Sequence, residues 1–417
     1  MKPVLNELCS KGFISMVYLD DFLCIGNSYS TCRDNVKATV KLLKSLGFVI
    51  NAKKSSLIPQ TRCKYLGFIL DSTRMGLELT VDKKVSLNIL IENFLTAQRC
   101  KIRDFAKLIG SLISACSAVA YGWLYTKQLE KEKFFALCVN GDDYDQIMSI
   151  PKYLKSDLLW WKNVIPLAFN PIKQSRYKIT IYTDASTTGW GAVCKGVKTH
   201  GLWSESERRI HINFLELLAM FLALKCFASN QRNCEILLRV DNTTAISYIN
   251  KMGGIQYPKF NKLARQIWQW GEQRNIWLFA SYIASKDNIE ADKESRINNI
   301  DTEWELNEHA FNSIIKQFGV PKIDLFATRI NNKCNTFCSW HRDPDAFAID
   351  AFTISWSNWF FYAFPPFALI LKTLRKIITD EAKGLVVVPN WPTQPWYPIF
   401  TSLCTEKPLL FDPSIGL

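Results

Sequence analysis

Four acidic residues in the middle of the chain have positions that suit a metal centre. Asp184 follows a β-rich run, and Glu216 lies near the start of an amphipathic segment. Asp241 ends an apolar run, and Asp292 begins a helical segment. The spacings are 32, 25 and 51 residues. Carboxylates at strand ends and helix starts of one mixed sheet can converge on Mg²⁺ ions, which activate water and stabilise the leaving oxygen of a phosphodiester.

Each of these acids also has a purely structural interpretation. Glu216 could form a capping box with Asn213 at the helix start. Asp241 could cap the helix that follows it, and Asp292 could simply interact with a helix dipole. Asp184 could end its strand in a turn. The four residues taken singly therefore leave both interpretations open.

A second acidic pair lies near the N-terminus, in the sequence Tyr18-Leu-Asp20-Asp21. Apolar β-rich runs flank it on both sides, which predicts a hairpin. Adjacent carboxylates repel each other, and a divalent cation relieves that repulsion. The alternative is an ordinary Asp-Asp turn without chemistry.

The elements that would position these acids follow from hydrophobic periodicity and turn residues. In the first 175 residues we expect strands at 13–19, 22–25, 48–50 and 65–70, and helical segments at 35–46, 82–135 and 153–161. Further on we expect strands at 178–182, near 193, near 210, at 235–240 and at 277–282, with helices at 214–228, at 244–251, through 267 and near 292. A polar stretch, residues 296–308, indicates a boundary. Beyond it we expect strands at 323–326 and 385–388 and a helix at 367–378.

Length and charge set the wider frame. At 417 residues the chain is too long for one core and should hold several domains. The net charge is +6 over residues 1–150, +9 over 151–300 and −2 over 301–417. The positive excess thus lies where the candidate sites lie, as expected if that part faces a polyanion. Lysines that merely confer solubility are the alternative.

The chain shows no sign of a membrane or secretory destination. Its longest apolar stretch, residues 359–371, is interrupted by Pro365-Pro366 and is shorter than the roughly 20 residues of a membrane span. The N-terminus has no apolar signal core. Thirteen cysteines at irregular spacing favour reduced thiols. We therefore expect an intracellular protein, cytoplasmic or nuclear, without a membrane partner.

Three linked motifs resemble the palm of reverse transcriptases. They are Tyr18-x-Asp-Asp, then Leu46-Gly-Phe-x-Ile-Asn-x-x-Lys54-Ser, then Tyr65-Leu-Gly-Phe68. The resemblance implies that Asp20 and Asp21 are metal ligands and that Lys54 lies near the nucleotide or template. The family's first metal-binding aspartate lies upstream of this motif, and the 17 residues before Tyr18 contain no Asp. We therefore expect a truncated polymerase that does not extend primers by itself.

Four later segments resemble type 1 ribonuclease H, in the family's order. They are Tyr182-Thr-Asp184-Ala-Ser186, Glu216-Leu-Leu-Ala, Val240-Asp241-Asn242-x-x-Ala and Asn288-x-x-Ala-Asp292-x-x-Ser-Arg296. The resemblance implies a five-stranded mixed sheet in which Asp184, Glu216, Asp241 and Asp292 hold Mg²⁺, or Mn²⁺. It also implies that Ser186, Asn213 and Asn242 contact the substrate, the asparagines at the 2′-hydroxyls of the RNA strand. A histidine often found before the last aspartate has no counterpart in residues 281–287, which predicts slow turnover.

The order of these parts, and the wording of residues 183–191, 212–217 and 249–254, resemble DIRS-type retrotransposons, which mobilise with a tyrosine recombinase. Residues 301–417 resemble the tail of those elements, which is compared with Dam-like adenine-N6 methyltransferases. Phe364 stands where such an enzyme needs a polar residue before Pro-Pro, and no glycine follows Asp324. A structural or nucleic-acid-binding remnant is therefore favoured over an active methyltransferase. Cys334, Cys338 and His341 have the spacing of zinc ligands but lack a fourth, so buried thiols are favoured.

The sequence thus predicts a multidomain α/β and α+β protein. We expect a partial palm at residues 1–80, a helical thumb and connection at 81–175, a ribonuclease H-like domain at 176–300 and a methyltransferase-like α/β block at 301–417. The predicted activity is Mg²⁺-dependent cleavage of RNA in RNA–DNA hybrids. RNA template, DNA and other element-encoded proteins are the further expected partners. A catalytically inert nucleic-acid-binding remnant is the alternative, and polymerase activity restored by a longer chain or a partner subunit is a third.

Overall fold

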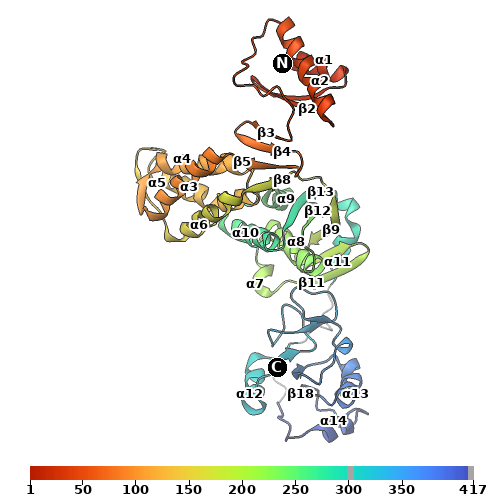
Figure 1. Ribbon diagram of the computed structural model, residues 1–417. Coiled ribbons are helices and arrows are strands. Elements are labelled where there is room, and N and C mark those ends of the chain that lie inside the picture. The colour runs from red at the N-terminus through yellow and green to blue at the C-terminus, as the bar shows by residue number, and fades with distance from the viewer. Residues whose placement is uncertain (298–304, 412–417) are drawn as a thin grey trace. The chain divides into compact units, whose positions relative to one another are not determined.

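The structure is a computed structural model that describes residues 1–297 and 305–411 (Figure 1). It divides into two compact units, Met1–Ser175 and Arg176–Leu417. Part of the polar stretch 296–308, and with it the expected boundary at 300/301, lies outside the described residues. No helix among the described residues is long and apolar enough to cross a membrane.

The N-terminal segment is a small two-layer arrangement of helices on a hairpin. Its elements are α1 (Lys2–Ser10), β1 (Ile14–Tyr18), β2 (Asp21–Ile25) and α2 (Tyr29–Ser45). Ser28 and Thr31 form the capping box that begins α2. Asn35 fastens α2 to the hairpin, because its amide donates to the carbonyls of Ile14 and Ile25, at 2.7 and 3.0 Å. The core beneath is small, so the polar bonds of Asn35 carry much of the positioning.

The rest of the first unit is a short antiparallel sheet followed by helices. The strands, in the order β3-β4-β5-β8, are β3 (Arg62–Tyr65), β4 (Phe68–Asp71), β5 (Gly76–Leu79) and β8 (Phe169–Pro171). The helices are α3 (Val81–Thr96), α4 (Ile102–Ala115), α5 (Lys127–Val139) and α6 (Lys155–Val164), and β6 (Arg99–Lys101) pairs with β7 (Ile147–Ser149). Phe105 and Trp161 are fully buried among these helices. Burial of large apolar side chains of this kind supplies most of the stabilisation.

A five-stranded mixed sheet organises the second unit. Its strands are β9 (Tyr177–Ala185), β10 (Gly189–Cys194), β11 (Val197–Leu202), β12 (Cys234–Val240) and β13 (Ile276–Tyr282). The spatial order is β11-β10-β9-β12-β13, with the first three strands antiparallel and the last two parallel to β9. This is the mixed five-stranded sheet that the sequence predicts.

Helices cover this sheet: α8 (Ile212–Ala228), α9 (Thr243–Asn250), α10 (Pro258–Glu272) and α11 (Ile289–Ser295), with the short α7 (Glu205–Arg208) before them. α8 is apolar around most of its circumference and packs on β9 and β10, with α9 and α10 beside it. α11 packs against β9, β10 and β11. A Cβ at Gly191 would lie 2.4 Å from both the Ala291 carbonyl oxygen and the Ser295 nitrogen, so only glycine lets α11 approach β10 so closely.

The C-terminal segment has a small parallel sheet of its own, in the order β14-β17-β18. The strands are β14 (Ile323–Asp324), β17 (Phe360–Ala363) and β18 (Lys383–Val386), and the helices are α12 (Glu308–Phe318), α13 (Ile370–Asp380) and α14 (Tyr397–Leu403). β15 (Cys338–Ser339) pairs with β16 (Ala348–Ile349). Trp356 and Phe361 are fully buried in its core. Arg329 of this segment donates to both carboxylate oxygens of Glu207, at 2.9 and 3.0 Å.

Several expected elements differ in the structure. The helical segment expected at 82–135 is interrupted by β6 between α3 and α4 and by a 3₁₀ turn, Gly122–Tyr125, between α4 and α5. Residues 48–50 form no strand, since this stretch follows the end of α2 as irregular chain and Val49 is 97% exposed. The single strand expected at 65–70 is instead a β3–β4 hairpin, whose turn places Leu66 and Gly67 at positive φ. No strand forms near Ile210. This residue lies in the turn between the short α7 and α8, and the third strand of the sheet is β11, earlier in the chain.

Candidate active site

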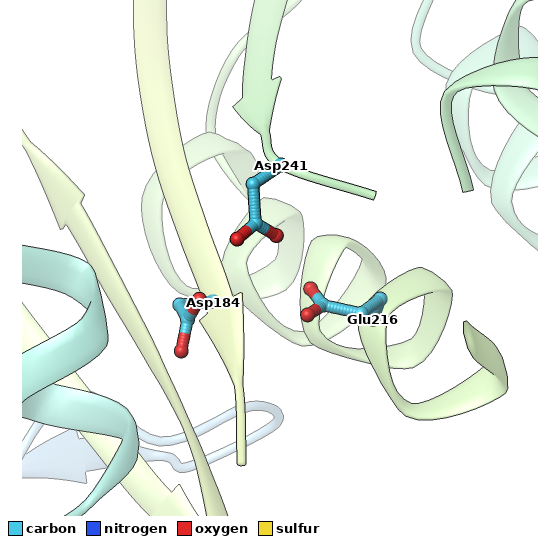
Figure 2. Close-up of side chains that lie close together, drawn as sticks. All are labelled: Asp184, Glu216 and Asp241. Carbon is cyan, nitrogen blue, oxygen red and sulfur yellow. The ribbon is translucent and has the colours of Figure 1, made fainter. Parts of the chain in front are cut away.

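Three carboxylates of the second unit converge at one place, from three different elements. Asp184 lies in β9, Glu216 in the second turn of α8, and Asp241 directly after β12. Each offers an oxygen, and these atoms all lie within 4.8 Å of one another. Figure 2 shows the three side chains turned towards a common space. Because β9 and β12 are parallel neighbours, the Asp184 end of one strand and the Asp241 end of the other meet at the same edge.

The structural interpretations of Asp184, Glu216 and Asp241 do not hold for their local geometry, whereas Asp292 does lie in the first turn of α11, where it can interact with the helix dipole. His211, not Asn213, caps α8, since its ring nitrogen accepts the Asn213 N–H at 3.1 Å. Asn242, not Asp241, caps α9, accepting from the Ala245 N–H at 3.0 Å. Asp184 lies within β9 and not in a turn. The caps are therefore supplied by neighbours, which leaves the acids without a helix-capping role.

Burial makes the cluster electrostatically costly without a cation. Glu216 is 4% exposed, and burial followed by the charges of Asp184 and Asp241 raises its pKa to about 9. Burial, supported by the charges of Asp241 and Asp292, raises the pKa of Asp184 to about 6, against the opposing effect of a hydrogen bond from Ser295. The Oε2 atom of Glu216 is buried without a hydrogen-bond partner among the described residues. An orphaned carboxylate oxygen beside two further carboxylates suits a hard divalent cation.

Asp292 lies near this cluster but is engaged by its own helix. Its Oδ1 atom accepts from the guanidinium of Arg296, at 2.6 and 3.0 Å. Its charge contributes to the raised pKa of Asp184, and the Ser295 hydroxyl lies 2.7 Å from Asp184 Oδ2 and 2.9 Å from the Asp292 carbonyl oxygen, so the two residues are neighbours. The structure thus brings three of the four predicted ligands together and places the fourth beside them in an ion pair.

The predicted substrate-contacting residues of this unit lie around the same cluster. The amide of Asn242 donates to the Asn213 side-chain oxygen at 2.9 Å, so the two asparagines are side by side. Asn213 also donates to Thr244 at 3.4 Å. Ser186 donates to the Ser295 carbonyl at 2.6 Å and accepts from the N–H groups of the following turn. Its hydroxyl therefore supports the loop and α11 in the structure.

Two serines at the cluster were not predicted from the sequence. Ser295 donates to Asp184 Oδ2 at 2.7 Å, and Ser285 donates to Asp241 Oδ2 at 2.6 Å. They lie 111 and 44 residues from their partners, so no local pattern joins them. The only available signal was the position of Ser295 three residues after Asp292, in the last motif.

The acidic pair of the first unit is built differently. Tyr18 pairs with Asp21, so Leu19 and Asp20 form a two-residue turn, and Leu19 has a φ of +52°. A β-hairpin turn usually places Gly or Asn at positive φ, because other side chains are strained there. Asp20 and Asp21 are both exposed, and no third metal-ligating side chain joins them among the described residues. Lys54 is exposed in the turn after Asn51.

The candidate site residues of the C-terminal segment have structural roles, as hydrogen-bond acceptors or buried side chains. The carboxylate of Asp324 is 2% exposed and accepts the N–H groups of Phe326 and Lys333, at 3.2 and 3.0 Å. Phe364 packs against the apolar core. Cys334, Cys338 and His341 belong to no metal-ligand group in the described chain. The two cysteines are buried, and the Cys334 thiol lies 3.6 Å from the Pro321 carbonyl oxygen.

Comparison with known proteins gives a family match at the N-terminus and a similarity to viral polyproteins. Residues 1–70 match the reverse transcriptase (RNA-dependent DNA polymerase) family. Over 301 residues the chain is 25% identical to the enzymatic polyprotein of Cauliflower mosaic virus (strain CM-1841), covering 67% of this chain and 40% of the relative. Over 246 residues it is 25% identical to the enzymatic polyprotein of Figwort mosaic virus (strain DxS), covering 54% and 33%. The chain thus spans about two fifths or less of the length of these relatives.

Solved structures with similar parts include a foamy viral protease–reverse transcriptase in complex with an RNA/DNA hybrid. That likeness has a TM-score of 0.36 and 16% identity, over 67% of this chain and 37% of the other. Another is LC11-RNase H1 in complex with an RNA/DNA hybrid, with a TM-score of 0.24 and 22% identity, over 28% and 93%. The chain is a mixed α/β protein whose residues 1–70 match the reverse transcriptase family, and over part of its length it is similar to viral enzymatic polyproteins.

Proposed function

We propose that the ribonuclease H-like domain, residues 176–297, cleaves the RNA strand of RNA–DNA hybrids with the help of Mg²⁺, or Mn²⁺ in its place. The observation that carries this proposal is the convergence of Asp184, Glu216 and Asp241 within 4.8 Å, from β9, from α8, which packs on β9, and from the end of β12. Bound divalent ions would supply an activated water and stabilise the leaving oxygen. The protein's part is to hold the carboxylates and the scissile phosphate in place.

The residues around the cluster have separate roles in this proposal. Asp184, Glu216 and Asp241 would hold the cation, and Asp292 would be a weaker further ligand, because Arg296 already pairs with it. Asn213 and Asn242, already hydrogen-bonded to each other, offer amide groups to the 2′-hydroxyls of the RNA strand. Ser186 keeps the loop after β9 in place beside the substrate.

The test is cleavage of a labelled RNA strand annealed to DNA, measured in Mg²⁺ with the full chain. Asp184→Asn should abolish cleavage, because it removes a charged ligand and keeps the shape. Asp287→Asn is the matched control, since Asp287 is an exposed acid on the 3₁₀ turn before α11. Binding that weakens with salt but never leads to cleavage by the unsubstituted chain would instead support an inert nucleic-acid-binding remnant.

The first unit supports a different role. The family match over residues 1–70 favours contact with an RNA template or with DNA, through Lys54 and the turn that carries Asp20 and Asp21. Two-metal nucleotidyl transfer needs more ligands than the two adjacent acids that the described hairpin offers. We therefore expect no primer extension by this chain alone. Extension that is lost in Asp20→Asn would show that a complete polymerase site forms.

The finer assignment is to a DIRS-type element whose other proteins include a tyrosine recombinase, in an intracellular setting. It is supported by the amino-acid sequences of residues 183–191, 212–217 and 249–254, which resemble those elements. For the C-terminal segment we propose a structural or nucleic-acid-binding remnant of a methyltransferase-like block. The carboxylate of Asp324, which accepts two backbone N–H groups, and the packed ring of Phe364 support this role over methyl transfer.

A further inference from the structure

Each carboxylate of the cluster has one hydrogen-bond donor that limits its orientation. Glu216 accepts the backbone N–H of Ala185, and Asp241 accepts the hydroxyl of Ser285. Asp184 accepts the hydroxyl of Ser295, at 2.7 Å. These donors differ in burial, since Ser295 is 0% exposed and Ser285 lies on the surface. A hydrogen bond to a carboxylate gains strength where water is excluded, so the Ser295 bond should matter more than the Ser285 bond.

The hydroxyl of Ser295 is not what attaches α11 to the sheet. The Asn288 amide at the start of α11 donates to the Thr183 carbonyl at 2.9 Å, in a buried position. At the other end of α11, Ser186 donates to the Ser295 carbonyl at 2.6 Å. The backbone of α11 also packs directly on Gly191, which pairs with Asp184 across β9 and β10. The helix is therefore held by bonds and packing that do not use the Ser295 hydroxyl.

The hydroxyl has one proton and two acceptors within reach. Besides Asp184 Oδ2, the Asp292 carbonyl oxygen lies 2.9 Å away. When Asp184 is ionised its oxygen is the stronger acceptor, so the proton points to the carboxylate. The bond then restricts rotation of the carboxylate plane of Asp184.

We propose that Ser295 is a positioning residue for metal binding: its buried hydroxyl orients the carboxylate of Asp184 towards the cation. The inference rests on the proposed function and names the group that prepares one of its ligands. An outer partner of this kind typically contributes a factor of about 10 to 100 in metal affinity.

The test measures Mg²⁺ binding to the full chain by calorimetry, without substrate, and separately the Mg²⁺ concentration needed for half-maximal hybrid cleavage. Ser295→Ala should weaken Mg²⁺ binding about tenfold or more and raise the Mg²⁺ requirement by a similar factor. Ser285→Ala should have a smaller effect, because its bond to Asp241 is exposed to water. Asn288→Ala is the structural control: it removes an anchor of α11 without touching a carboxylate, so it should lower the melting temperature but leave Mg²⁺ affinity unchanged.

Ser295→Cys keeps the shape of the side chain with a somewhat larger atom and a weaker donor, and its Mg²⁺ affinity should fall between those of serine and alanine. It also replaces the alanine variant if that variant fails to fold. Unchanged Mg²⁺ affinity in folded Ser295→Ala, or equal losses in Ser295→Ala and Asn288→Ala, would overturn the proposal. If the unsubstituted chain binds Mg²⁺ but cuts no hybrid, the nuclease proposal fails and the binding series still decides the role of Ser295. If it binds no Mg²⁺, both proposals fail.

Discussion

The chain carries acidic clusters in two regions, and they are built in opposite ways. In the β1–β2 hairpin, Asp20 and Asp21 are neighbours in sequence, exposed, and supported by a small core. In the five-stranded sheet region of the second unit, Asp184 and Glu216 are buried, and Asp241 reaches them from a third element. The hairpin tolerates its charges because water solvates them, whereas the buried cluster carries a strong electrostatic cost. A bound cation would offset this electrostatic cost, so the buried cluster is the stronger candidate for a metal site.

The largest difference should appear when the buried glutamate is neutralised. Glu216→Gln should lower hybrid cleavage by more than about 100-fold, since loss of an outer partner of a metal ligand alone costs about 10- to 100-fold. The same change should raise the stability of the metal-free protein at pH 7, by on the order of 1–3 kcal/mol, because it removes the cost of burying a carboxyl whose pKa is about 9. Urea unfolding in a chelator measures the second effect. A loss of both activity and stability would mean that Glu216 has a structural role.

The second prediction concerns pH in the absence of metal. The pKa of Asp184 rises to about 6 and that of Glu216 to about 9, both above their values in an unfolded chain. Between the unfolded and folded pKa values the native state binds more protons, so the free energy of unfolding should fall as pH rises through this window. Mg²⁺ should reverse the trend, because it binds the ionised carboxylates. Melting curves from pH 5 to 9, with Mg²⁺ and with chelator, measure both slopes, and identical slopes would contradict a metal site here.

An intermediate effect is expected at the fourth acid. Asp292 is partly exposed and paired with Arg296, so Asp292→Asn removes a ligand that is less tightly built into the cluster. Hybrid cleavage and Mg²⁺ affinity should each fall by about tenfold, less than in Asp184→Asn. Rate measurements over a range of Mg²⁺ concentrations separate these effects. A loss as large as that of Asp184→Asn would show that Asp292 is a full member of the cluster.

The smallest effect should come from the exposed hairpin. Asp21→Asn should leave hybrid cleavage and the Mg²⁺ dependence of the melting temperature unchanged, because Asp21 is solvated and distant in sequence from the cluster. The same two measurements check it, beside Asp184→Asn as the positive control. A clear fall in cleavage would mean that the two acidic regions act on one substrate.

The sequence predicts which elements carry the acidic residues wherever an apolar run leads directly to the acid. The positions of Asp184 and Asp241 follow from apolar strands that end in an acid, and that of Glu216 from the start of a long apolar helix. Local spacing does not predict the hydrogen bond from Ser295 to Asp184, because the two residues lie 111 positions apart in the sequence. Helix caps were also misassigned, because His211 is a rarer capping residue than Asn213 and no periodicity distinguishes them. The strand expected near Ile210 does not form. A short apolar run next to a helix start is compatible with either a strand or the beginning of the helix.

The central claim is that a divalent cation binds between Asp184, Glu216 and Asp241. Diffraction from crystals soaked in Mn²⁺, recorded at the manganese absorption edge, tests it most directly. We expect an anomalous peak within bonding distance of all three carboxylates. This peak should disappear in Asp184→Asn. A peak only at the β1–β2 hairpin, or no peak among the three acids at a saturating Mn²⁺ concentration, would contradict it.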